Sequence, residues 1–170
     1  MKRRSKRLTK RPGLPPGSLV YTGEKRRRAP RMTLLQYDAD DYEKKQVKDL
    51  DAVREARGQK GILWLNVDGV NDVDLIARIG ELFDLHPLVQ EDIVNTQQRP
   101  KLDDYDSYLF VVLKMLRTTD DGKRRVDEEH LSIVCGPGFV LSFQEKEGDV
   151  FDVIRDRVVN AKGRVRLLGS

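Results

Sequence analysis

The sequence predicts an α/β fold in which a mixed parallel and antiparallel sheet is sandwiched between helices. One observation is that strand-like apolar stretches alternate with helix-like stretches over residues 32–95. A second is that three strand-like stretches then follow one another over residues 107–145, with only short turns between them. Alternation favours a sheet covered by helices, whereas strands joined by tight turns pair antiparallel. A chain of 170 residues with 38% hydrophobic content can enclose the core of one domain, or of one domain and a fragment.

The first half of the chain predicts three strands and two helices. The strands are expected at residues 19–23, 32–38 and 61–70. Residues 38–58 predict a helix, because acids lie early, bases lie late and Gly58 can end it. Residues 71–85 predict the clearest helix, since Asn71 can cap it and apolar residues recur at i, i+3, i+4 and i+7.

The second half predicts a helix, three consecutive strands and a final helix. Pro87 suits the first position of a helix over residues 86–95. Pro100 keeps the stretch that follows extended, because it disfavours helical geometry at Arg99. The three strands are expected at residues 107–118, 124–136 and 139–145, and the last helix at 148–163. Asp121-Gly122 predicts the hairpin turn between the first two strands.

Charge divides the chain into a basic arm and an acidic body. Residues 1–31 carry 12 Lys and Arg and a single acid, Glu24, whereas the rest carries 20 basic and 27 acidic residues. Residues 1–18 are expected to form a flexible arm before an α/β domain at 19–160. The arm can serve as a solubilising terminus, or it can contact anionic lipid or nucleic acid. Binding to nucleic acid is not expected, because Tyr21 is the only aromatic residue there for base stacking.

Several classes of protein are disfavoured by composition. One cysteine, Cys135, excludes an intramolecular disulfide framework and a cysteine-based zinc site, and it suits a reducing compartment. No apolar run approaches the roughly 18 residues of a membrane span, and no signal peptide is visible. Glycine-rich phosphate loops and nucleophile arrangements are also absent from the sequence. We therefore predict a protein that is not an enzyme.

The histidines, the cysteine and the tryptophan are expected to be structural. His86 precedes Pro87, where it suits a helix N-cap or a packing role. His130 lies on a strand whose pattern fits half-burial, and no second histidine supports a metal site. Cys135 is expected to be a small buried apolar side chain, and Trp64 to lie in the core.

Glu91 and Asp92 are the candidate metal ligands. Neighbouring residues on a helix point about 100° apart, so these two cannot form one compact chelate. One carboxylate can still bind a Mg²⁺ ion that keeps most of its waters, with the other ligands supplied from elsewhere, including another subunit. The alternative is a solvated helix face. For Arg99 and Lys101 we expect salt bridges to the acids at 103–106, which add negative potential to the same region.

Four stretches of the chain form a specific combination of motifs. They are PGLPPGSLVYTG (12–23), WLNVDGV (64–70), LFDLHPLVQEDIVNTQQRPKLDDYDSYLFVVLKM (82–115) and EEHLSIVCGPGFVLSFQEKEGDVFDVIRDRV (128–158). The combination of HPLV-EDI, then QRPK, then a strand with the pattern Y-F-V-LKM resembles the cytoplasmic N-terminal domain of the CorA family of magnesium and cobalt transport proteins. The resemblance implies the soluble-domain fold of that family, which agrees with the α/β sheet predicted above.

The resemblance also implies an architecture beyond these residues. CorA-like chains continue into a stalk helix and two transmembrane helices, and five subunits form an ion channel in the membrane. Residues 161–170 are then the start of the segment that leads to the stalk. Such a domain lies at the cytoplasmic face of the cell membrane, and in a homopentamer the basic residues 1–31 can reach anionic inner-leaflet lipid.

Metal binding at Asp92 and Glu91 is what the resemblance implies for function. In the family, divalent ions bind between neighbouring cytoplasmic domains, with Asp92 opposed by an aspartate on the adjacent subunit's stalk and Glu91 contributing to a second site. The expected role is a sensor of Mg²⁺ or Co²⁺ that regulates transport, with only weak binding in this chain alone. A zinc-transporting branch of the same superfamily is the alternative, disfavoured by the lack of Cys and His clusters.

Overall fold

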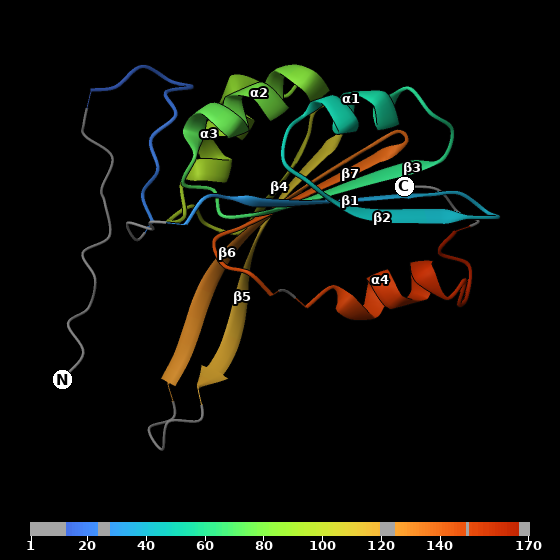
Figure 1. The fold of residues 1–170 in the computed structure, drawn as a ribbon. Helices are drawn as coiled ribbons and strands as arrows, with labels where there is room; N and C mark the ends of the chain where they lie inside the picture. The colour runs from blue at the N-terminus through green and yellow to red at the C-terminus, as the bar shows by residue number, and fades with distance from the viewer. Residues whose placement is uncertain (1–12, 24–27, 120–124, 149, 167–170) are drawn as a thin grey trace.

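The computed structural model describes residues 13–23, 28–119, 125–148 and 150–166, and these form a single seven-stranded sheet with four helices. Figure 1 shows their arrangement. The strands are β1 (Arg31–Tyr37), β2 (Tyr42–Val47), β3 (Ile62–Asp68), β4 (Lys101–Asp104), β5 (Leu109–Thr119), β6 (Arg125–Gly136) and β7 (Phe139–Gln144). The helices are α1 (Asp51–Arg57), α2 (Val73–Phe83), α3 (Pro87–Val94) and α4 (Asp152–Val159).

The sheet is mixed, which confirms the predicted fold class. Its order is β2-β1-β3-β7-β6-β5-β4. Strands β3 and β7 pair in parallel, and every other neighbouring pair is antiparallel. The predicted run of three consecutive antiparallel strands is confirmed as β5, β6 and β7, while the Asp121-Gly122 turn lies outside the described residues.

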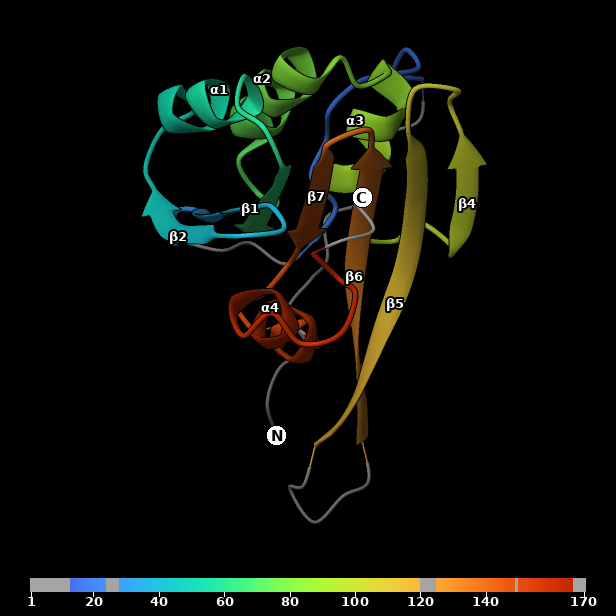
Figure 2. The same ribbon diagram turned by 90° about the vertical axis from the view of Figure 1, so that its right-hand side faces the viewer.

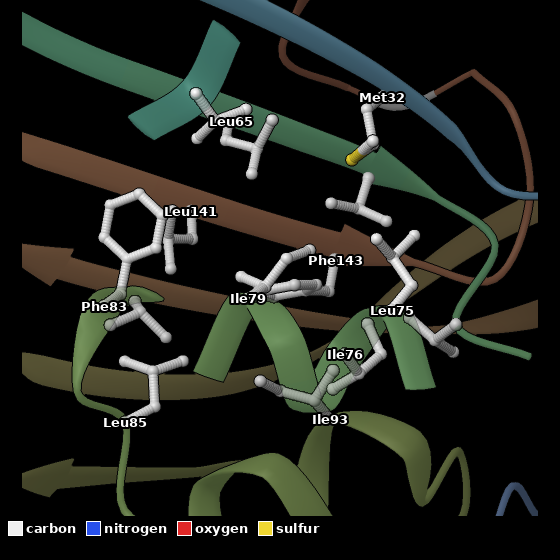
Figure 3. Packing of buried hydrophobic residues seen from close by; sticks show 14 of the residues in the cluster. Met32, Leu65, Leu75, Ile76, Ile79, Phe83, Leu85, Ile93, Leu141 and Phe143 are labelled. Atoms are coloured by element: carbon white, nitrogen blue, oxygen red, sulfur yellow. The ribbon is translucent and has the colours of Figure 1, made fainter. Parts of the chain in front are cut away.

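Helices cover both faces of the sheet, but unequally. Helices α1, α2 and α3 lie on one face and α4 on the other, as Figures 1 and 2 show. The larger core lies under the first three helices, where Ile79 and Phe83 of α2 lie beside Phe143 and Leu141 of β7 (Figure 3). A smaller core joins Val158 of α4 to the opposite face of the sheet. Both cores follow from burial of apolar surface, the main favourable contribution to folding.

The predicted helix over residues 38–58 is wrong. The chain turns at Asp38, whose carboxylate accepts the backbone N–H groups of Asp40 and Asp41 at 2.8 and 2.9 Å. It then returns as β2, which pairs with β1 and exposes every side chain except Val47. An edge strand tolerates such a charged sequence, and the charges discourage pairing with other chains. Only Asp51–Arg57 are helical, and they end at Gly58 as predicted.

The strand predicted at residues 19–23 is also wrong. This segment pairs with none of the strands in the described part of the chain; instead it lies along α3, where the Thr22 backbone N–H donates to the Val94 carbonyl at 3.3 Å. Smaller corrections concern helix ends. Asp72 rather than Asn71 caps α2, accepting the Leu75 N–H at 3.0 Å, and α4 is shorter than residues 148–163.

Within the described residues, none of the helices has both the length and the apolar character that crossing a membrane requires.

Candidate metal site at helix α3

Local signals position α3 and thereby its two acids. Pro87 occupies the first turn, and His86 caps the helix because its Nδ1 accepts the Leu88 N–H at 3.2 Å, which confirms the predicted N-cap. Val89, Ile93 and Val94 are fully buried in the larger core. Because these apolar contacts hold one face of α3 against the core, they fix the directions in which the other side chains of the helix project, including its two acids.

Asp92 lies against the protein rather than on a solvated helix face. The residue is only 9% exposed. Its Oδ1 accepts a hydrogen bond from Gln98 Nε2 at 2.7 Å, and its Oδ2 forms a salt bridge with Lys101 Nζ at 2.7 Å. Both partners come from the QRPK segment that leads from α3 into β4. The carboxylate is therefore held in place by one amide and one cation.

Lys101 is shared between two carboxylates. Its ammonium lies 2.7 Å from Asp92 and 2.6 Å from Asp103, and 5.5 Å from the centre of the Phe110 ring. Burial acts to lower the pKa of Lys101, but hydrogen bonds to Asp103 and Asp92 outweigh it, and the pKa is raised. The lysine stays charged at neutral pH. The predicted salt bridge between this basic segment and the acids at 103–106 is confirmed for Lys101.

Glu91 is directed to a different partner. Its Oε2 accepts the backbone N–H of Gly17 at 2.6 Å. Thr22 Oγ1 donates to Asn95 Oδ1 at 3.0 Å, so the segment before β1 is attached at two points, to α3 and to its C-cap residue. The sequence did not predict this contact, because Gly17 and Glu91 are 74 positions apart and no local pattern relates them.

These contacts test whether the acids suit a divalent cation. Glu91 and Asp92 have separate partners, which agrees with the expectation that they do not form one chelate. In the described parts of the chain, no three His, Cys, Asp or Glu side chains cluster closely enough to hold a metal ion. Asp92 nevertheless offers carboxylate oxygens that already bind a cation, the Lys101 ammonium. It fits the role of one oxygen ligand to a Mg²⁺ ion that keeps most of its waters.

His130 lies beneath α3 and is more deeply buried than expected. The residue is 0% exposed, not half-buried, and Ser132 Oγ lies 2.9 Å from its Nε2. Burial above all, and then the charge of Lys114, lower the pKa of His130 to about 3, while the backbone of Asp92 and Ile93 acts in the opposite direction. A neutral buried imidazole thus forms part of the support for α3.

Cys135, which was predicted to be buried, is only half-buried, and burial raises the pKa of its thiol.

A second polar cluster lies on the α4 face of the sheet and was not predicted. Asp68 accepts hydrogen bonds from Asn66 Nδ2 at 3.0 Å and from Gln144, and Arg31 lies 3.7 Å away. The cluster borders a cavity of about 480 Å³. Arg155, at another wall, pairs with Asp152 at 3.0 Å and lies over the ring of Trp64, which is buried as predicted. Because these charges neutralise one another, we assign the cluster a structural role.

Comparisons with known proteins agree with the fold and with the motifs around α3. A family model described as "CorA-like Mg2+ transporter protein" matches residues 59–170. The cobalt/magnesium transport protein CorA of Thermotoga maritima is 40% identical over 161 residues, which cover 95% of this chain and 45% of that protein. The chain therefore spans less than half the length of this relative.

Two solved structures share the fold. The full-length CmaX protein superposes with a TM-score of 0.56 at 15% identity, over 89% of this chain and 42% of that one. The complete CorA magnesium transporter of Methanocaldococcus jannaschii gives a TM-score of 0.50 at 9% identity, over 81% of this chain and 38% of that one. These likenesses concern the fold, whereas the family model and the 40% identity concern descent. The chain belongs to the family of CorA-like Mg²⁺ transporter proteins.

Proposed function

We propose that this chain is the cytoplasmic, divalent-cation-sensing domain of a Mg²⁺ and Co²⁺ transport channel, and that it regulates conduction without conducting ions itself. The observation that carries the proposal is the Asp92 carboxylate, held by Gln98 and paired with the ammonium of Lys101, in a chain 40% identical to a cobalt/magnesium transport protein. A family named for transport also supports a protein that is not an enzyme.

In the proposed assembly, Asp92 and Glu91 face a neighbouring subunit of a homopentamer. Asp92 supplies one carboxylate oxygen to an ion that an acid of the neighbour also binds, and Glu91 contributes to a second site beside it. Bound Mg²⁺ supplies positive charge between these acidic surfaces. Without that ion no cation links the acids of neighbouring subunits, the ring loosens and the pore opens. Couplings of this kind are typically about 1–3 kcal/mol each, and several sites around a ring add.

The remaining parts of the chain have roles in the same proposal. Residues 19–160 form the sensing domain, and residues 161–170 lead toward a stalk and transmembrane helices outside this sequence. The basic residues 1–31 contact anionic lipid at the inner leaflet, where each Lys or Arg near the surface contributes about 1 kcal/mol. Residues 1–12, which include the most basic part, lie outside the described residues, so the flexible arm stays a prediction.

The proposal is tested by replacing Asp92 with Asn. The substitution keeps the size of the side chain and its bond to Gln98 but removes the charge that attracts Mg²⁺. In the membrane-embedded protein, Asp92→Asn should shift Mg²⁺ inhibition of ion flux to higher Mg²⁺ concentration. Flux through reconstituted channels is the measurement, and Mg²⁺ inhibition identical to that of the unmodified protein would contradict the proposal.

A matched control is Asp106→Asn, which removes one charge from the same acidic region. Asp106 is exposed and has φ of 60°, a conformation that Asn tolerates well. Its substitution should leave Mg²⁺ inhibition unchanged. For the isolated chain we expect weak, millimolar-scale binding of Mg²⁺ or Co²⁺, because one or two carboxylates rarely displace water from Mg²⁺.

A further inference from the structure

We infer that Lys101 is a built-in competitor for the cation at Asp92, an ammonium that Mg²⁺ must displace in order to bind. This inference rests on the proposed function and names the regulation of the same site. The charge at Asp92 is already neutralised within this chain, by a lysine only nine positions away in strand β4.

The geometry makes the two cations mutually exclusive. Asp92 has two oxygens; Oδ1 accepts Gln98 Nε2 at 2.7 Å and Oδ2 is 2.7 Å from Lys101 Nζ. The Asp92 side chain is only 13% exposed, so little of its surface is open to a further ligand. A divalent cation and an ammonium at the same oxygen repel each other strongly in a partly buried site. Binding of one therefore requires withdrawal of the other.

The structure also supplies a place for the displaced ammonium. Asp103 lies 2.6 Å from Lys101 Nζ, and the Phe110 ring lies beneath the same group. Lys101 can thus give up Asp92 and keep a carboxylate and an aromatic contact. Displacement breaks one ion pair rather than leaving a lysine without a partner, which lowers its cost.

The consequence is that Lys101 raises the Mg²⁺ concentration at which the sensor responds. A competing cation tethered to the same domain lowers the apparent affinity for Mg²⁺ by a constant factor, as any pre-existing competitor does. The site then responds only when Mg²⁺ is abundant. Lys101 is a regulatory residue in this view, since it acts on Asp92 and is not itself a metal ligand.

The experiment removes the competitor and measures Mg²⁺ binding directly. Lys101→Met keeps the length and the packing over Phe110 but not the charge. Backbone amide signals near Asp92 are followed by NMR during MgCl₂ titration of the 170-residue chain, at constant ionic strength. We expect Lys101→Met to bind Mg²⁺ about threefold to thirtyfold more tightly than the unmodified chain, the range for loss of one partly buried ion pair.

Controls separate this effect from net charge and from altered folding. Lys45→Met removes the same charge from β2, where Lys45 pairs with Glu43 at 3.0 Å, and it should leave Mg²⁺ affinity unchanged. Lys101→Gln repeats the test with a polar side chain, and unperturbed amide spectra without Mg²⁺ establish that the variants fold. The double variant Asp92→Asn, Lys101→Met should lose the gain.

The outcomes distinguish the inference from the proposed function. Binding by Lys101→Met that is no tighter than in the unmodified chain overturns the inference, and so does a gain that survives Asp92→Asn. If Asp92→Asn weakens binding while Lys101→Met leaves it unchanged, the metal site stands and only the competitor is wrong. If neither substitution alters binding, both the site and the competitor are wrong.

Discussion

Neighbouring residues of the same chemical type have different environments in this protein. Glu91 accepts the Gly17 N–H, whereas Asp92 is held by Gln98 and Lys101. The two histidines differ as sharply: His86 caps α3 at the surface, and His130 lies fully buried beneath the same helix. The surroundings of each side chain, rather than its type, therefore decide what it does.

His130 should make the stability of the chain depend on pH. Its pKa is lowered from 6.5 to about 3. As pH falls below about 6.5, the unfolded chain binds a proton that the native chain does not accept until near pH 3, so the free energy of unfolding decreases through that window. Between pH 7 and pH 5, the free energy of unfolding of His130→Gln should therefore decrease by about 2 kcal/mol less than that of the unmodified chain.

Urea unfolding at the two pH values measures this difference. The comparison within each variant cancels whatever the substitution itself costs at neutral pH. Equal decreases for His130→Gln and the unmodified chain would show that His130 does not remain neutral in the native protein.

The elements depend on contacts that join distant parts of the chain. Strand β2 exists because the Asp38 turn returns the chain along β1, although its sequence has the charges of a solvated helix. Strand β3 begins close to the end of β1, and Gly61 allows this approach. Gly61 has φ of +97°, and a Cβ there would collide with the backbone carbonyl of Tyr37.

Gly61→Ala should destabilise the start of β3. The added methyl group faces a backbone atom that cannot move aside easily, and a positive φ strains any L side chain. We expect a loss of about 2–4 kcal/mol in the free energy of unfolding, measured in urea. Gly58→Ala is the control, because its φ is −80° and a Cβ meets only Glu55 O at 3.6 Å; it should change stability by less than about 1 kcal/mol. Equal effects of the two substitutions would contradict the role of Gly61.

In the molecule as a whole, the helices form two unequal layers, one on each face of the sheet. Helices α1 to α3 share the larger core with the sheet, whereas α4 is attached by the smaller core around Trp64 and Val158. Figure 1 also shows β5 and β6 continuing as a ribbon beyond the other strands. Burial differs accordingly: α2 buries Leu75, Ile76, Ile79 and Phe83, while Val153 of α4 is 63% exposed.

This asymmetry predicts that the two faces open at different free energies. Amide hydrogens of α2 should exchange only at the free energy of global unfolding, and those of α4 should exchange through a local opening well below it. Native-state hydrogen exchange at increasing urea concentration measures both. Equal protection of α2 and α4 would show that the sheet and its four helices unfold as one cooperative unit.

Much of the fold was determined by local patterns in the sequence. The amphipathic period of α2, Pro87 at the start of α3 and the three consecutive strands each predict their element correctly, because short-range sterics and one-sided burial act within about ten residues. The HPLV-EDI and QRPK motifs likewise indicated the family that the comparisons then showed.

Other features were decided only by the tertiary structure. The parallel pairing of β3 with β7, the strand at Tyr42–Val47 and the Gly17–Glu91 contact join residues that local patterns cannot relate. The same holds at the candidate site, where the sequence predicted a salt bridge for Lys101 but not that Asp92 shares it. The physical reason is that a periodic pattern shows which residues become buried, whereas the partner of a buried charge depends on how distant segments pack.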